Sequence, residues 1–198
     1  NAKVAAKFES ISGLVQFREQ NGKWQNAKIG TPLTPNTELQ TGPTGHASLI
    51  FPNGTKVTLK SGTLVKLDQY TTGSYGTQTN MSLRVGRMNA DIAKVNDANV
   101  RNHFRVRTPT VVAGVRGSNA DFSNGTRTTI QMNEHSVQVR DGNGQTSTVA
   151  QGDKSQITKG GTITADKMAN KDNTVTMAGQ GATAGEVEMA FSSGDFSF

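Results

Sequence analysis

An all-β fold of many short strands, sandwich-like or solenoid-like and with little helix, is the fold class that the sequence predicts. Three observations support it. The 198 residues include 22 glycines, with only 33% hydrophobic and 18% charged residues, a composition typical of short strands separated by tight turns. Asn-Gly pairs, which favour hairpin turns, lie between strand-like runs. No window shows the sustained apolar spacing of an amphipathic helix.

The Asn-Gly pairs mark the expected hairpins, and each predicts a type I′ turn in which both residues take positive φ. They are Asn21-Gly22, Asn53-Gly54, Asn124-Gly125 and Asn143-Gly144. Apolar and polar residues alternate beside these turns, as at Leu49 and Phe51, so each run offers one face for burial. Further strands are expected at 14–17, 57–59, 64–67, 83–85, 104–106, 130–132 and 137–139, and around Val149 and Ile157.

The composition changes near residue 160 and divides the chain into a body, 1–160, and an extension, 161–198, rich in Gly, Ala and Thr. The charge changes at the same place. The body holds 19 Lys and Arg against 10 Asp and Glu, whereas the extension holds 2 against 5. The chain is therefore expected to be basic in its body and acidic in its tail.

The extension ends in a strand-like segment. Val187, Met189 and Phe191 alternate along it, and Phe196 and Phe198 follow. A phenylalanine left in water forgoes roughly 1.5–3 kcal/mol of burial, so these side chains are expected to be covered. Two arrangements remain open: the tail returns to cap its own sheet, or it pairs as an assembly strand with the edge of a neighbouring molecule.

No catalytic, cofactor or metal site is predicted. His46, His103 and His135 have no partner at a metal-ligand spacing, and the chain has no cysteine. Phosphate-binding and nucleophile-elbow motifs are missing, and the carboxylates of the body are isolated. We therefore expect that the protein is not an enzyme. No membrane span is expected either, because the apolar runs are far shorter than the ~20 residues that a spanning helix needs.

One charged patch is predicted. Arg101, Arg105, Arg107 and Arg116 lie in a stretch, 98–120, without any acidic residue, and Arg105 and Arg107 share a face if their segment is a strand. Such a face is either solvated or contacts an anionic group of a ligand or partner. Nucleic acid is not an expected partner, because the basic residues are not interleaved with aromatic ones and no docking helix is predicted.

Two blocks of the chain resemble a known family, the FecR domain of bacterial cell envelopes, over about 11–161. The first block comprises Gly13, Val15, Trp24, Gly30 and Leu33, followed by 39–42, 47–55 and 57–59. The second is a Thr-Pro segment, 104–109, followed by Ala-Gly-Val-Arg-Gly-Ser at 113–118. The resemblance implies an all-β domain of stacked short strands, exposed outside the cytoplasm, and it does not imply an enzyme.

The resemblance also bears on location. In the regulators of this family, such a domain follows a membrane helix and a cytoplasmic segment that controls a sigma factor. Neither segment is seen in this sequence, which begins at Asn1. We therefore expect a stand-alone domain that is secreted, held at the cell surface or located in the periplasm.

Two functional hypotheses follow. In the first, the chain is a structural subunit that associates with itself into an extracellular or cell-surface filament or layer, with the acidic tail of one copy on the basic body of the next. In the alternative, it is a monomeric periplasmic or envelope module that binds or senses a ligand or partner protein, as FecR-type relatives do. The expected partner is thus another copy of itself or another envelope protein, and no small-molecule substrate is evident.

Overall fold

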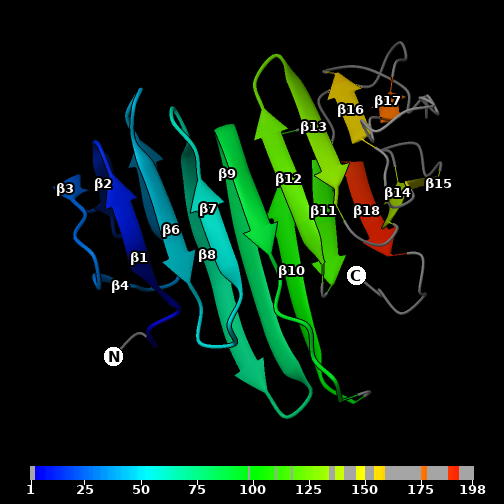
Figure 1. Ribbon diagram of the computed structural model, residues 1–198, viewed down its shortest axis with the longest axis horizontal. Helices are drawn as coiled ribbons and strands as arrows, with labels where there is room; N and C mark the ends of the chain where they lie inside the picture. Colours follow the sequence, from blue (N-terminus) through cyan, green and yellow to red (C-terminus); the bar gives the residue numbers. More distant parts are fainter. Residues whose placement is uncertain are drawn as a thin grey trace.

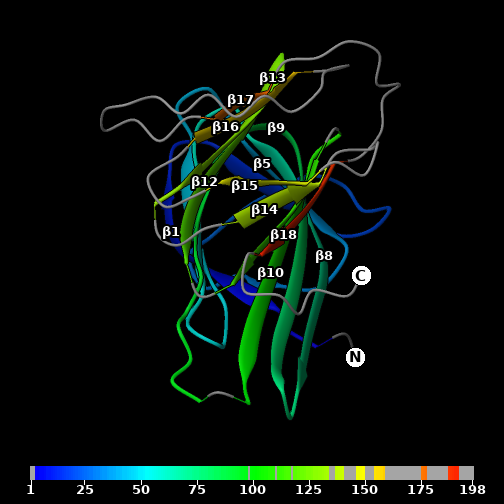
Figure 2. The same cartoon turned by 90° about the vertical axis from the view of Figure 1, so that its right-hand side faces the viewer.

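The computed structural model describes residues 3–97, 99–109, 111–116, 118–133, 137–140, 146–149, 154–158, 175–177 and 187–191. All regular secondary structure in these ranges is β-strand, which confirms the all-β prediction. Figure 1 shows the strands side by side, and Figure 2, turned by 90°, shows that they form two layers. In the described ranges, no helix is long and apolar enough to cross a membrane.

The two layers are here called sheet A and sheet B, and each is a continuous ladder of mainly antiparallel pairs. Sheet A runs β4 (Pro32–Leu33), β1 (Ala6–Ser12), β6 (His46–Ile50), β7 (Lys56–Leu59), the second part of β9 (Gly76–Asp91), β12 (Asn119–Asn124), β13 (Arg127–Met132), β16 (Lys154–Thr158) and β17 (Val175–Met177).

Sheet B has the same plan, and its hairpins alternate along the chain with the hairpins of sheet A. It runs β3 (Gln25–Asn26), β2 (Val15–Arg18), β5 (Thr37–Thr41), β8 (Leu64–Gly73), the first part of β9, β10 (Arg101–Arg107), β11 (Val111–Arg116), β18 (Val187–Phe191), β14 (Val137–Arg140) and β15 (Thr146–Val149).

The core lies between the two sheets and uses the alternating residues that the sequence singles out. Leu49 and Leu59 from sheet A are fully buried, as are Leu39 and Leu67 from sheet B. Phe51 joins the layers, since its ring lies 6.3 Å from that of Phe104 in an edge-to-face arrangement. Because alternate strand residues point to opposite faces, the outer faces of both sheets are left to polar side chains.

Strand β9 belongs to both sheets, and Gly86 is where it changes from one to the other. Before this residue the odd-numbered side chains, such as Met81 and Leu83, are buried, whereas after it the even-numbered ones, Met88 and Ala90, are buried. Gly86 has a φ of 101°, in a region that residues with a Cβ rarely adopt. The positive φ thus turns the strand so that both of its parts bury an apolar face in one core.

Two buried threonines form hydrogen bonds to the main chain at the corner where the chain crosses from one sheet to the other. Thr41 Oγ1 donates to the carbonyl of Lys60 and accepts from the N–H of Thr63. Thr63 Oγ1 in turn both donates to and accepts from the main chain of Arg87, at 3.0 Å each way. These side chains satisfy backbone groups that the change of sheet would otherwise leave unpaired.

The tight turns differ from the predicted type. In the described ranges, no Asn-Gly pair has a positive φ at both of its residues. The φ is positive at Asn21 in the first pair and at Gly54 in the second. At the first pair the Gly22 N–H donates to the Glu19 carbonyl, which centres the turn one residue earlier. At the second, the Gly54 N–H donates to the Phe51 carbonyl. The pairs mark hairpins correctly, but the type I′ prediction is wrong at the described pairs, and Asn143-Gly144 lies outside the described residues.

Strand β18, the predicted assembly strand of the tail, pairs inside the chain. Val111–Ala113 of β11 run parallel to it on one side, and Val137–Arg140 of β14 run antiparallel on the other. Strand β18 therefore has a partner within the chain on each side, β11 along Val187–Met189 and β14 along Glu188–Phe191, and a role as an assembly strand stays a prediction. Phe196 and Phe198 lie outside the described residues, and the domain boundary near residue 160 stays a prediction.

Candidate functional site

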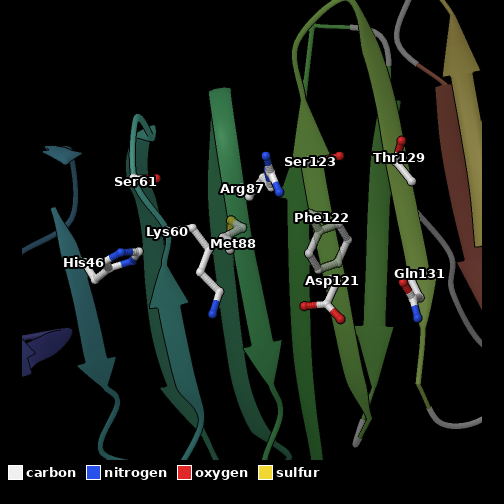
Figure 3. A pocket seen from close by; sticks show the side chains of 10 residues that line it. All are labelled: His46, Lys60, Ser61, Arg87, Met88, Asp121, Phe122, Ser123, Thr129 and Gln131. Carbon is white, nitrogen blue, oxygen red and sulfur yellow. The ribbon is translucent and has the colours of Figure 1, made fainter. Parts of the chain in front are cut away.

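A groove of about 560 Å³ lies on the outer face of sheet A. It crosses five neighbouring strand positions, from β6 to β13, and Figure 3 shows its side chains from close by. The lining residues are His46, Lys60, Ser61, Arg87, Met88, Asp121, Phe122, Ser123, Thr129 and Gln131. Met88 and Phe122 are each 1% exposed, so the exposed side chains of the lining belong to polar and charged residues.

The register of sheet A aligns five of these side chains in one row across the strands. Arg87 pairs with Ser123, and Ser123 pairs with Thr129. On the other side of Arg87, its carbonyl accepts a 2.9 Å hydrogen bond from the Lys60 N–H. His46 follows Lys60, since the pairing of Ala47 with Leu59 is one residue away. The row therefore reads imidazole, ammonium, guanidinium, hydroxyl, hydroxyl. We call it the polar row.

The two cations of the polar row, Lys60 and Arg87, have no acidic partner among the residues that the structure describes. By contrast, Lys56 lies 2.8 Å from Glu9, and Arg18 pairs with Glu38. Cβ atoms of directly opposite residues are about 4.5–5.5 Å apart, and like charges in that arrangement destabilise a sheet. The basic end of the groove is thus a region of uncompensated positive charge.

The opposite wall of the groove carries a carboxylate held in place by amides. Asn89 donates to one oxygen of Asp121 and Asn133 to the other, both at 2.9 Å. The same two amide groups also donate to the side-chain oxygen of Asn119, at 2.9 and 2.8 Å. Figure 3 shows Asp121 and Lys60 on opposite sides of β9. The groove therefore has cationic side chains and, across from Lys60, a carboxylate that amides hold in place.

The predicted arginine patch lies on the other sheet. Arg101, Arg105 and Arg107 stand on the outer side of β10, because Asn102, Phe104 and Val106 face the core. Arg116 pairs in register with His103. The structure thus brings the arginines of β10 onto one face of sheet B, away from the groove. Whether that face contacts an anion remains a prediction.

The environment of Tyr70, a core residue, alters its titration. Burial raises the pKa of its hydroxyl, and the backbone N–H of Asn53 partly offsets this effect. The ring packs in the core, 5.7 Å from Phe51, and not in the groove. Within the described ranges no cluster of histidine and acidic side chains is arranged to hold a metal ion.

Sequence reasoning did not find the groove, because its residues are spread over 46–131 and form no motif. A signal was present only in the alternation: Lys60, Arg87 and Ser123 all fall on the polar side of strand-like runs. Connecting them requires the strand order of sheet A, which places β9 between β7 and β12.

Comparisons with known proteins identify one family. The family described as FecR protein matches residues 37–143, more than half of the chain. Two crystal structures of a proposed anti-sigma factor from Parabacteroides distasonis ATCC 8503 are similar, with 17% identity and a TM-score of 0.48 in one and 16% and 0.49 in the other. Each match covers 61% of this chain and 54% of that chain, so this chain spans about half of that protein. No curated protein matches.

Proposed function

The chain belongs to the FecR protein family, and we propose that it acts there as a non-catalytic regulatory module that binds a partner protein through the groove of sheet A. The match confirms the resemblance seen in the sequence. FecR-type domains are regulatory modules that interact with other proteins. The identity of the partner and the role of the groove are the parts that we propose, together with a location outside the cytoplasm.

The observation that carries this proposal is the position of the groove within the family segment. Every residue that lines it, from His46 to Gln131, falls inside the matched range 37–143. The groove also combines exposed, uncompensated cations with a fixed carboxylate, and such groups give an interface specificity and orientation. A face of this kind is suited to a polar partner and not to burial in an apolar contact.

The same considerations favour a binding module over a self-assembling subunit. A subunit that donates its tail to a neighbour needs a free strand, whereas β18 has partners on both edges within its own chain. Family membership points the same way, because it connects the chain to regulators. The sensing reading, given as the alternative at the outset, is therefore the one that we propose.

Site-specific photo-cross-linking in the cells that make the protein tests the proposal. A photoreactive amino acid replaces Gln131 in the groove or, as a matched control, Gln69 on sheet B. The control is also a glutamine on a strand, and its side chain is exposed and bonded to Asn80.

The proposal predicts an adduct of defined mass with another protein at position 131 and none at position 69. A ladder of adducts with further copies of the same chain would instead establish self-assembly. No adduct at position 131, beside a clear one at position 69, would place the interface on sheet B and contradict the role of the groove.

A further inference from the structure

We propose that the groove holds an acidic sugar unit, with its anionic group at Lys60 and Arg87 and its hydroxyl groups along Asp121, Ser123 and Thr129. This inference rests on the proposed function in one respect, that the groove is a binding face. It adds the chemical class of the group that the groove recognises on its partner, a group with a carboxylate or phosphate beside several hydroxyl groups.

The anionic group of the ligand is inferred from the electrostatic repulsion between the two cations of the polar row. Lys60 and Arg87 are neighbours across the ladder, both exposed, and neither has an acidic partner in the described part of the chain. Directly opposed like charges weaken a sheet. A bound anion removes this repulsion and accepts charge-assisted hydrogen bonds from both side chains, and such bonds are the strong ones. His46, next in the row, supplies a further ring nitrogen.

The hydroxyl groups of the ligand are inferred from the rest of the polar row. Ser123 and Thr129 each offer one donor and two acceptor lone pairs, and Gln131, which pairs with Asp121 beside the row, offers both an amide N–H and a carbonyl. Strands are about 4.8 Å apart, so the row from Arg87 to Thr129 extends about 10 Å. A ligand with donors and acceptors along its length matches such a row, whereas a bare anion uses only one end.

Asp121 sets the direction in which the ligand lies. Its carboxylate, fixed by Asn89 and Asn133, accepts hydrogen bonds from hydroxyl groups but repels an anion. The anionic group is therefore directed toward Lys60 and Arg87. Because Met88 and Phe122 are each only 1% exposed, the groove offers no exposed aromatic or aliphatic side chain for the ring of a neutral sugar to stack on. Charge must supply most of the affinity.

Titrations followed by NMR of the full chain test this inference with four probes: glucuronate, glucose 6-phosphate, inorganic phosphate and glucose. Two variants, Lys60→Met and Arg87→Met, remove one cation each. Their matched controls are Lys56→Met, also on the outer face of sheet A but paired with Glu9, and Arg84→Met, on the same strand as Arg87 but near Glu38.

The expected result is binding of glucuronate and glucose 6-phosphate, weaker binding of inorganic phosphate and none of glucose. Each groove variant should weaken the two sugar acids at least about tenfold, the factor that one charge-assisted hydrogen bond contributes, and both controls should bind as the wild type does. Tighter binding of glucuronate than of glucose 6-phosphate would identify a carboxylate ligand, and the reverse order a phosphate one.

The inference is overturned if the groove variants bind the sugar acids as tightly as the wild type does. It is also overturned if glucose binds as tightly as the sugar acids, or if neither sugar acid binds. Inorganic phosphate binding as tightly as glucose 6-phosphate would overturn the role of the hydroxyl row. A failure of the proposed function can be told apart from a failure of this inference. In that case the adduct at position 131 would be absent, while the titrations would give the expected result. Conversely, an adduct without sugar-acid binding would refute only the ligand class.

Discussion

Replacement of Gly86 by alanine tests how one strand serves two sheets. A Cβ built at this position would lie 2.5 Å from Thr63 Oγ1 and 2.7 Å from the Gly62 carbonyl oxygen, and it would also collide with Thr63 Cα. Real Cβ atoms are not found that close to backbone atoms. The segment around Thr63 and strand β9 must therefore move apart in the variant.

The size of the loss follows from two contributions. A residue with a Cβ at the 101° φ of Gly86 carries a backbone strain of about 1–3 kcal/mol. Separation of the two segments breaks the pair of hydrogen bonds between Thr63 Oγ1 and the main chain of Arg87, which contribute about 1 kcal/mol each. Together they give a loss of about 4 kcal/mol, a large part of the roughly 5–15 kcal/mol by which domains are stable.

Two other glycines separate these contributions. Gly30 has a φ of 82° but a Cβ there meets nothing within 4 Å, so Gly30→Ala should show only the backbone strain. Gly125 has neither a positive φ nor a close neighbour, so Gly125→Ala should be nearly neutral. Urea unfolding, followed by circular dichroism and the fluorescence of Trp24, gives the three free energies. If Gly86→Ala loses no more than Gly30→Ala, the account of the crossing is refuted.

Further predictions concern the corner, the core and the tail. Thr63→Val should lose about 2 kcal/mol in the same assay, because it leaves the Arg87 N–H without its acceptor; an unchanged unfolding free energy would contradict the role of the corner. The raised pKa of Tyr70 favours the neutral hydroxyl in the native state, so stability is full below about pH 10 and is lost as the pH rises above it. Tyr70→Phe in a Tyr75→Phe background should abolish that alkaline loss, measured by unfolding at about pH 8 and about pH 11; a loss that persists would assign it to another group. Finally, light scattering should show a monomeric full chain, and truncation after Gly185 should promote association because it uncovers the edges of β11 and β14; an oligomeric full chain beside a monomeric truncation would instead support donation of the tail to a neighbour.

Local patterns were enough to predict the strands and the family. Alternation around Leu49 and Val57 marks β6 and β7 because the two faces of a half-buried strand differ in polarity. The Thr-Pro segment and the glycines of 113–118 point to the FecR family, which the comparison confirms. The turn type was not predictable in the same way, because a hairpin accommodates the same Asn-Gly pair in longer turns such as the one that closes at Gly54.

The crossing of β9 and the groove depend on contacts between distant parts of the chain. The change from odd to even burial at Gly86 is readable in the sequence only as a break in alternation, and such a break also marks the end of a strand. Lys60 and Arg87 are 27 positions apart in the sequence and meet because β7 pairs with β9. The arginines of β10 stood out because they lie close together along one strand, whereas the two cations of the groove, Lys60 and Arg87, come from separate segments of the chain.

The central claim is that the groove of sheet A binds a partner protein. Light scattering tests it most directly, because it gives the mass of the complex between the purified chain and the partner found by cross-linking. Thr129→Trp fills the groove, since Thr129 lines it on β13, and Thr71→Trp, on the exposed surface of β8, is the matched control. The account predicts a single complex of the two proteins for the wild type and for the control, and none for Thr129→Trp. A complex that forms equally well with Thr129→Trp, or growth of the chain alone into larger species, would contradict it.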